Sequence, residues 1–156
     1  MTKIRDNVFA ITGAGSGIGQ ALAIEIARLG GHVSISDVDA EGLEATKVAC
    51  EAFDVLTHDM IVDVSDRQAM FDWADEVASA HGHVHGIVNN AGVSLRATVE
   101  DMHFDDFEWL MNINFWGVVH GTKAFLPFIR AAGEGSVVNI SSVFGIVGIP
   151  TQSAYN

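Results

Sequence analysis

Residues 7–31 read NVFAITGAGSGIGQALAIEIARLGG, and three patterns follow one another in this stretch. The apolar run NVFAIT at 7–12 is typical of a strand that is buried on both faces of a sheet. Apolar residues then recur every three or four positions, the period of a helix with one buried face: Ile18, Leu22, Ile26 and Leu29. The pair Gly30–Gly31 ends this helix. The stretch therefore predicts a buried strand and an amphipathic helix joined by a glycine-rich turn.

The alternation of short apolar runs with helical patterns continues along the chain. Further strands are predicted at 32–36, 56–62, 84–89 and 135–141, and further helices at 39–52, 66–80 and about 105–132. In the helix at 66–80, Met70, Trp73 and Val77 should face inward. Strands that alternate with helices of this length favour a parallel sheet with right-handed crossovers. We therefore expect one α/β domain over residues 1–156, a doubly wound parallel sheet with helices on both faces.

The composition argues against several classes of function. Eight Lys and Arg against 20 Asp and Glu give a formal net charge of -12, and such a surface repels nucleic-acid phosphates. No stretch approaches the roughly 18 consecutive apolar residues that cross a bilayer, and the N-terminal apolar run is too short for a signal peptide. The single cysteine, Cys50, fits a reducing compartment. We expect a soluble, cytoplasmic protein with neither nucleic acid nor membrane as a partner.

The turn between the first strand and the first helix has the composition of a phosphate-binding loop. We call residues 13–19 the glycine loop; it contains Gly13, Gly17 and Gly19, with Ser16 and Ile18 between them. Glycines allow a tight turn and a close approach of the backbone to a pyrophosphate. The following helix offers free N–H groups and the positive end of its dipole to phosphates. A strand before and a helix after are the context of a dinucleotide site; the alternative is a purely structural turn.

Asp37 ends the second predicted strand, about 20 residues after the glycines, where an acid can accept hydrogen bonds from the adenosine ribose. A carboxylate there repels the 2′-phosphate of NADP, and the segment SDVDAEGLEA around it contains no Arg or Lys. Ser16, inside the glycine loop, is uncharged as well. NAD is therefore favoured over NADP. The alternative role for Asp37 is a helix N-cap, although Asp39 is also available for that role.

Several motifs occur in an order and at spacings that together resemble the short-chain dehydrogenase/reductase family. They are TGAGSGIG at 12–19, DV at 63–64, NNAG at 89–92, Asn114, and Ser142 with Tyr155. The resemblance covers all 156 residues as the N-terminal three-fifths of such an enzyme, which implies a Rossmann-type sheet truncated after the fifth strand. It implies that Asp63 and Val64 contact the adenine. It also implies that Asn90, Ala91 and Gly92 present their backbone to the cofactor ribose, whereas Asn89 is mainly structural.

The resemblance also assigns the residues that would carry the chemistry. Tyr155, the only tyrosine, would be the general acid/base, and Ser142 would hydrogen-bond the substrate oxygen. Ser141 is an equal candidate by chemistry alone, and only the family spacing favours Ser142. Asn114 would hold a water in a proton relay, or else it is a polar residue bonded to neighbouring backbone. In the family a lysine four residues after the tyrosine favours its phenolate form; the matching position, 159, lies beyond Asn156.

Two functions of different classes fit these residues. The first is an NAD-dependent oxidoreductase that interconverts a secondary alcohol and its ketone; the apolar segment 143–150 favours a lipophilic substrate. Its relatives imply a homo-oligomer, a dimer or a tetramer. The second is a catalytically inactive NAD-binding fragment or association module without the active-site lysine. A chain that ends at 156 also leaves the fifth strand as an apolar sheet edge, a liability for aggregation.

The alternating histidines His81, His83 and His85 are the one pattern that would hint at a metal. They precede the fourth predicted strand, at the end of the sheet away from the expected cofactor. We therefore expect no metal site.

Overall fold

A computed structural model describes residues 3–156 and contains one five-stranded parallel sheet with the strand order β3-β2-β1-β4-β5. The strands are β1 (Val8–Thr12), β2 (His32–Asp37), β3 (Thr57–Ile61), β4 (Gly86–Asn89) and β5 (Ser136–Asn139). Every pair of neighbouring strands runs parallel. The doubly wound α/β fold predicted from the alternating sequence pattern is confirmed.

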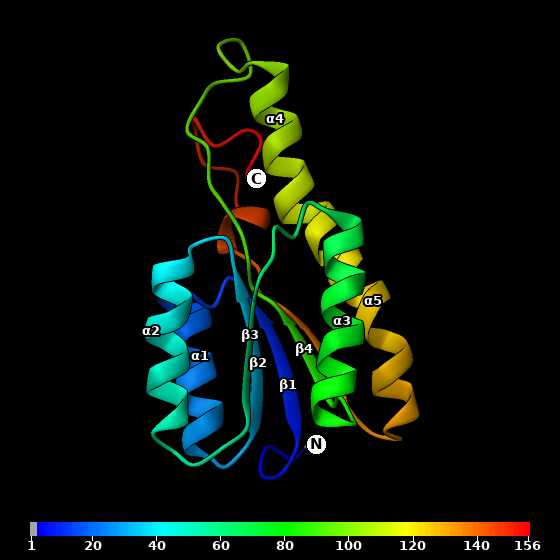
Figure 1. Cartoon of the computed structure of the whole chain (residues 1–156). Coiled ribbons are helices and arrows are strands. Elements are labelled where there is room, and N and C mark those ends of the chain that lie inside the picture. The colour runs from blue at the N-terminus through cyan, green and yellow to red at the C-terminus, as the bar shows by residue number, and fades with distance from the viewer. Residues whose placement is uncertain (1–2) are drawn as a thin grey trace.

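Helices cover both faces of the sheet (Figure 1). On one face lie α1 (Gly17–Arg28) and α2 (Ala40–Glu51), and on the other lie α3 (Arg67–His81) and α5 (Gly117–Ala131). Alternate residues of β1 enter the two cores: Val8 and Ala10 pack on the side of α3 and α5, Phe9 and Ile11 on the side of α1 and α2. The continuous apolar run NVFAIT follows from this position, because a central strand has no face left for water.

Trp73 is the largest fully buried side chain and fixes α3 on the sheet. Its ring meets Phe125 of α5 edge to face, with the centroids 4.9 Å apart. Its indole Nε1 donates a hydrogen bond of 3.1 Å to Ser34 Oγ on β2. Met70 and Val77 are fully buried beside it, as the helical period at 66–80 predicts.

The single long helix predicted at about 105–132 is in fact interrupted. It consists of α4 (Phe104–Met111), a π-helical turn (Asn112–Trp116) and α5. The turn places the side-chain amide of Asn114 against the backbone of Val93. The amide donates a hydrogen bond to Val93 O and accepts one from Val93 N. Such π-turns widen the helix by one residue and are frequent at functional sites. Helical periodicity alone cannot show this insertion, because the flanking segments keep the same apolar spacing.

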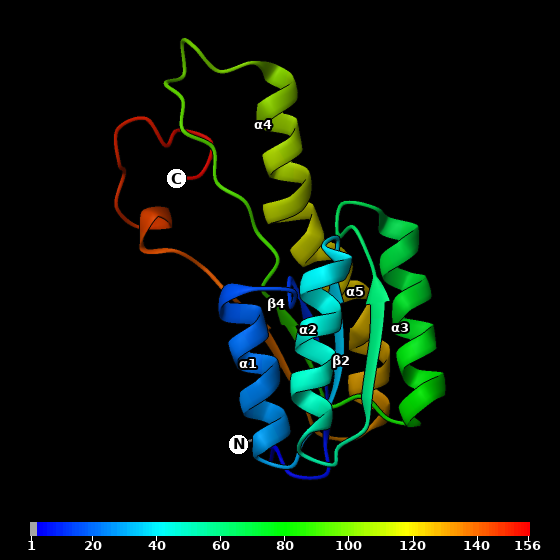
Figure 2. The ribbon, with the colours of Figure 1, turned by 60° about the vertical axis from the view of Figure 1, so that its left-hand side comes forward.

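The chain beyond the carboxyl ends of the strands forms a separate upper part (Figure 2). It contains α4 and the C-terminal residues, which include a short 3-10 helix (Val143–Gly145). A parallel bridge between Ala97 and Gln152 joins the segment after β4 to the C-terminal segment. At the sheet edge, β5 exposes apolar side chains, with Val138 42% exposed. None of the helices in residues 3–156 has the length and apolarity to span a membrane.

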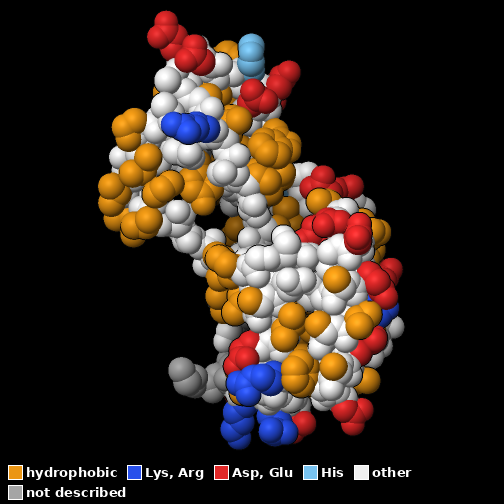
Figure 3. All heavy atoms as spheres, turned by 90° about the vertical axis from the view of Figure 1, so that its left-hand side faces the viewer, with side chains coloured by type: hydrophobic (Ala, Val, Ile, Leu, Met, Phe, Trp, Pro, Cys, Tyr) orange, Lys and Arg blue, Asp and Glu red, His pale blue; other side chains and the backbone are white. Residues whose placement is uncertain are grey.

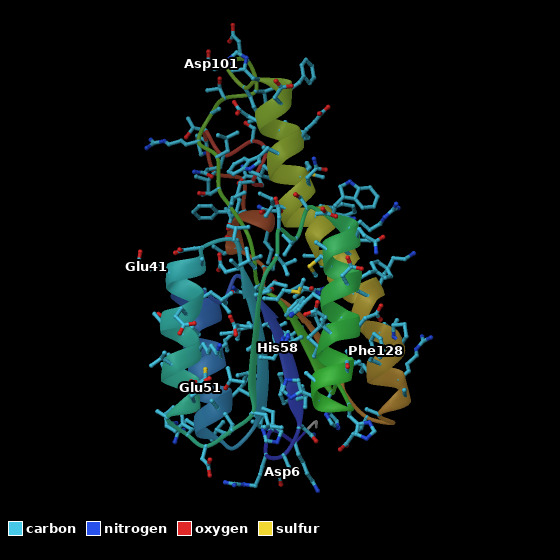
Figure 4. All side chains as sticks on the ribbon, in the orientation of Figure 1. Asp6, Glu41, Glu51, His58, Asp101 and Phe128 are labelled. Atoms are coloured by element: carbon cyan, nitrogen blue, oxygen red, sulfur yellow. The ribbon has the colours of Figure 1, made fainter. Side chains whose placement is uncertain are left out.

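Three histidines cluster at the amino end of the sheet, opposite the upper part. The ring of His81 lies between His32 and His58, with centroids 6.4 Å from each. His58, labelled in Figure 4, pairs with Ser34 Oγ at 2.9 Å, and Glu76 lies 3.7 Å from its other nitrogen. Both ring nitrogens of His81 are buried without a hydrogen-bond partner in the described residues. No group of three or more potential ligand side chains in the described part of the chain is arranged to hold a metal ion.

We expect this cluster to make the fold sensitive to acid. Burial, reinforced by the charges of His58 and His32, lowers the pKa of His81 from 6.5 to about 4. As the pH falls, His81 becomes protonated near pH 6.5 in the unfolded chain but only near pH 4 in the folded chain. The free energy of unfolding is therefore highest above pH 6.5 and decreases as the pH falls from 6.5 to about 4. The full shift corresponds to roughly 3 kcal/mol, and partial solvent exposure of the ring reduces the expected loss to about 1–2 kcal/mol.

Urea unfolding of the full-length protein at a series of pH values measures this loss. His81→Phe keeps a ring in place but cannot titrate, and it should flatten the dependence of the unfolding free energy on pH. His103→Phe changes an exposed histidine outside the cluster and serves as the control with the wild-type slope. An unchanged slope in His81→Phe would show that other groups cause the acid sensitivity.

Candidate functional site

A cleft of about 780 Å³ lies beyond the carboxyl ends of the strands, between the sheet and the upper part of the molecule. Open α/β sheets bind ligands at this edge. Figure 3 shows the molecule hollowed between its upper part and its body. The cleft brings together nearly all the residues predicted to form the site: Gly13, Ser16, Gly17, Ile18, Asp37, Asp63, Val64, Asn90, Ala91, Gly92, Asn114, Ser142 and Tyr155. Gly19, the last residue of the glycine loop, is buried and does not line the cleft.

The glycine loop has a backbone that only glycine tolerates at two points. Gly13 and Gly17 adopt the left-handed conformation, with φ of 65° and 56°. Gly19 is required by close approach instead, because a Cβ there would overlap the carbonyl oxygen of Gly13 and the side-chain amide of Asn90.

The N-terminus of α1 opens onto the cleft. Its N-cap, Ser16, has an extended backbone, and its side chain makes no capping hydrogen bond within the described residues. The first backbone hydrogen bond of the helix runs from Gln20 N to Ser16 O at 3.2 Å. The N–H groups of Gly17, Ile18 and Gly19 lie before this first hydrogen bond. They have no acceptor within the helix, because no helical turn precedes them. This end of the helix fits an anionic phosphate.

The carboxylate of Asp37 is held in a fixed position at the rim of the cleft. Its Oδ2 accepts a hydrogen bond of 2.7 Å from Gly15 N, and its Oδ1 accepts one of 3.0 Å from Asp39 N. The N-cap of α2 is Asp39, whose side chain accepts from Glu41 N. Asp37 therefore ties the glycine loop to the end of β2 and leaves the capping role to its neighbour. Asp37 and Asp63 supply the charged side chains among the described residues that line the cleft, which include no Lys or Arg.

The segment Asn90–Ala91 is fastened to the glycine loop by a residue that sequence reasoning missed. Thr12 Oγ1 accepts hydrogen bonds of 3.0 Å from both Asn90 N and Ala91 N. The Asn90 side chain in turn donates to Thr12 O and Gly13 O, each at 3.0 Å. Any contact from these two peptide groups to a ligand would therefore come from their carbonyl oxygens. Asn89 points elsewhere, to Thr122 and Asn139. A polar residue that closes the apolar run NVFAIT was the available signal for Thr12.

Asn114 makes a two-way pair with the peptide of Val93. Its Nδ2 donates to Val93 O at 2.7 Å, and its Oδ1 accepts from Val93 N at 2.8 Å. Of the two roles considered for Asn114, bonding to backbone is thus present in the structure, and it positions the segment that follows Gly92. One amide hydrogen and one lone pair remain available beside the cleft.

Ser142 and Tyr155 lie on the far wall of the cleft, connected through Phe144. Ser142 caps the 3-10 helix, and its Oγ accepts a hydrogen bond of 3.2 Å from Phe144 N. The ring of Phe144 meets the ring of Tyr155 edge to face at 6.1 Å. The bond from Phe144 N occupies only a lone pair of the Ser142 oxygen, so the hydroxyl hydrogen of Ser142 can still donate to a ligand. Strand β5 ends at Asn139, so Ser142 stands three residues past the strand, not at its close as 135–141 predicts.

Comparison with known proteins identifies the family of the chain. The family model described as short chain dehydrogenase matches residues 7–156. SadH of Mycobacterium tuberculosis, provisionally described as an oxidoreductase, is 44% identical over 156 residues, which are 100% of this chain and 56% of SadH. Levodione reductase of Leifsonia aquatica is 38% identical over 157 residues, covering 99% of this chain and 59% of that enzyme.

A solved structure with bound NAD has the same fold. It is a short-chain dehydrogenase/reductase from Burkholderia phymatum in complex with NAD, which superposes with a TM-score of 0.96 at 33% identity over 99% of this chain and 56% of that one. The chain thus spans little more than half the length of the relatives that it matches. With a family model that matches almost every residue and with relatives above 30% identity, the chain belongs to the short-chain dehydrogenase family.

Proposed function

We propose that this chain carries the NAD site and part of the catalytic centre of an oxidoreductase that interconverts a secondary alcohol and its ketone. The observation that carries the proposal is that one cleft brings together the glycine loop, Asp37, Ser142 and Tyr155. Residues far apart in the sequence thereby offer a dinucleotide cradle and a pair of hydroxyl groups to the same space. Two solved structures with bound NAD support it, because they share the fold at TM-scores of 0.96 and 0.94.

The described residues fit a bound dinucleotide. The volume of about 780 Å³ lies within the usual range of small-molecule sites. The glycine loop and the first turn of α1 would hold the diphosphate, and Asp37 would accept hydrogen bonds from the ribose hydroxyls. Asp63 and Val64 would contact the adenine. The carbonyl groups of the Asn90–Gly92 segment would face the other ribose.

The proposed chemistry divides between the cofactor and two side chains. NAD, when bound, supplies the acceptor for the hydride that leaves the carbinol carbon. Tyr155 Oη takes the proton of the substrate hydroxyl in the same direction and returns it when a ketone is reduced. The Ser142 hydroxyl donates a hydrogen bond to the substrate oxygen and holds it beside Tyr155. Asn114, through its pair with Val93, keeps this side of the cleft in place.

The wall beside Ser142 and Tyr155 favours an apolar substrate. Val93, Ile113 and Ile140 contribute apolar side chains to the lining of the cleft. The segment after Ser142 continues this character, with Val143 62% and Ile146 87% exposed. A lipophilic alcohol or ketone is therefore the substrate class that we propose.

Mixing the full-length protein with NAD and a panel of secondary alcohols tests the function directly, through the absorbance of the NADH formed. Binding of NAD without NADH formation from any alcohol would favour the inactive binding module instead.

We expect Asp37→Asn to weaken the preference for NAD over NADP. The amide oxygen can still accept the bond from Gly15 N, whereas the amide nitrogen cannot accept the bond from Asp39 N, and the negative charge disappears. A hydrogen bond to a charged group contributes about 1.5–3 kcal/mol, so the NAD dissociation constant should rise by about 10- to 100-fold. NADP should gain relative to NAD because its 2′-phosphate no longer meets a carboxylate. Calorimetric titration with both nucleotides gives the ratio of the two constants, and an unchanged ratio in the variant contradicts the role of Asp37.

The outer face of α4 and the π-turn supports the proposal of a homo-oligomer. Its aromatic side chains are unusually exposed for a folded surface: Phe104, Phe107, Trp109, Phe115 and Trp116 are between 42% and 86% exposed. A second copy of the protein is the partner that the family resemblance implies for this face. Sedimentation velocity of the full-length protein distinguishes a dimer or tetramer from a monomer.

A further inference from the structure

Thr46 is a buried hydroxyl that connects α2 to the glycine loop. The residue is fully buried on α2, and its Oγ1 donates a hydrogen bond of 2.8 Å to the carbonyl oxygen of Ala14. The same oxygen accepts one of 2.8 Å from Gln20 Nε2 on α1. The carbonyl of Gly42 lies 3.0 Å away, within the helix itself. One hydroxyl thus joins the loop and the two helices that flank it, and Thr46 does not line the cleft.

The N–H and carbonyl groups of Ala14 and Gly15 all have hydrogen-bond partners, and three of the four partners, on Ser36, Thr46 and Gln20, lie outside the cleft lining. Ala14 N donates to Ser36 O at 3.0 Å, and Gly15 N donates to Asp37 Oδ2 at 2.7 Å. The carbonyl of Ala14 accepts from Thr46, and that of Gly15 accepts a longer bond of 3.4 Å from Gln20. These residues immediately precede Ser16 and Gly17, where the proposed diphosphate site begins. The position of that site therefore depends on contacts made on its buried side.

Gly42, one turn before Thr46 on α2, makes this contact possible. A Cβ at Gly42 would lie 2.5 Å from the carbonyl oxygen of Gly15 and 3.1 Å from its carbonyl carbon. The backbone of α2 is thus pressed directly against the backbone of the loop. Figure 4 shows the direction of the helix, with Glu41 at the end nearest the cleft and Glu51 at the far end.

We propose that Thr46 and Gly42 make α2 a positioning element for the phosphate site. The affinity for NAD then depends on the hydroxyl of Thr46 and on the absence of a side chain at Gly42, although neither residue contacts the cofactor. This inference rests on the proposed function of the glycine loop. Its physical basis is preorganisation: a loop already held in the binding geometry pays less to be ordered when the ligand arrives. A buried carbonyl that loses its donor must move to find another, and Ala14 can move only by shifting the residues that follow it.

Two substitutions of Thr46 separate positioning from packing. Thr46→Val keeps the shape and removes the hydroxyl, so Ala14 O and Gln20 Nε2 both lose a partner; we expect the NAD dissociation constant to rise on the order of tenfold. Thr46→Ser keeps the hydroxyl and removes a methyl group, so it should lower the melting temperature but bind NAD within about twofold of the wild type. Calorimetric titration of the full-length variants at a temperature where each is folded gives the constants, and thermal unfolding without NAD gives the stability.

Gly42→Ala provides a second test that removes no hydrogen-bonding group from the protein. Alanine favours a helix more than glycine does, so the change should stabilise α2 taken alone. The methyl group must nevertheless displace the Gly15 carbonyl, and we expect a similar loss of NAD affinity. This variant decides the matter if Thr46→Val does not fold.

The outcomes distinguish this inference from the function on which it rests. Absence of NAD binding by the wild-type protein overturns the proposed function, and with it the role of α2. Binding by the wild type with equal constants in Thr46→Val and Gly42→Ala overturns the positioning role alone. Weakened binding in both, with recovery in Thr46→Ser, supports it.

Discussion

Replacing Tyr155 with phenylalanine should lower kcat of the full-length enzyme by about 10²- to 10⁴-fold, the range that a general acid/base contributes. Phenylalanine keeps the edge-to-face contact with Phe144 and removes only the hydroxyl that would exchange the proton. NAD binding should remain, because the glycine loop and Asp37 form the opposite part of the cleft. Steady-state kinetics combined with NAD titration measures both effects on one sample.

Ser141→Ala and Ser142→Ala are the matched controls for this wall of the cleft. Both serines line it, and only Ser142 is assigned the substrate oxygen. Ser142→Ala should therefore lower kcat, whereas Ser141→Ala should leave it close to the wild type. Full activity in Tyr155→Phe would refute the assignment of the acid/base, and a larger loss in Ser141→Ala than in Ser142→Ala would exchange the roles of the two serines.

Gly19→Ala should abolish NAD binding at ordinary concentrations, although Gly19 does not line the cleft. A Cβ at this position would overlap Gly13 O and the Asn90 amide, both of which belong to the floor of the site. Relieving the overlap must separate the glycine loop from the Asn90 segment. A displacement of about 1 Å in a preorganised site can cost about 100-fold, and overpacking of this kind lowers the free energy of unfolding by about 1–3 kcal/mol.

Gly148→Ala is the control for the change from glycine to alanine. No atom lies within 4 Å of a Cβ built on Gly148, and its backbone is not in the left-handed region. Its NAD dissociation constant should equal that of the wild type, measured by the same titration. NAD binding by Gly19→Ala at wild-type strength would mean that the loop can accept a side chain there and would remove the basis for the cradle.

The local patterns of the sequence were sufficient for the five strands, for α1, α2 and α3, and for the placement of the glycine loop and Asp37 at the cleft. Each apolar run or helical period records whether a segment is buried on two faces or one, and burial is a property of the segment itself. Asp37 was identified because it closes a strand, and the carboxyl ends of parallel strands must meet at one edge of the sheet. The family spacing added Ser142 and Tyr155, which no periodicity singles out.

Only the tertiary structure determined which distant residues share a hydrogen bond. Thr12 with Asn90, Ala14 with Thr46, and Asn114 with Val93 are separated by 78, 32 and 21 residues. A threonine or an asparagine on a buried face has the same local signature whether its partner is a loop, a helix or its own backbone. The sequence by itself determined the alternating strands and helices and the glycine turn between the first two. The close approach of α2 to that turn, and the π-turn around Asn114, depend on how whole elements pack, because a hydrogen bond forms only where two surfaces meet within about 3 Å.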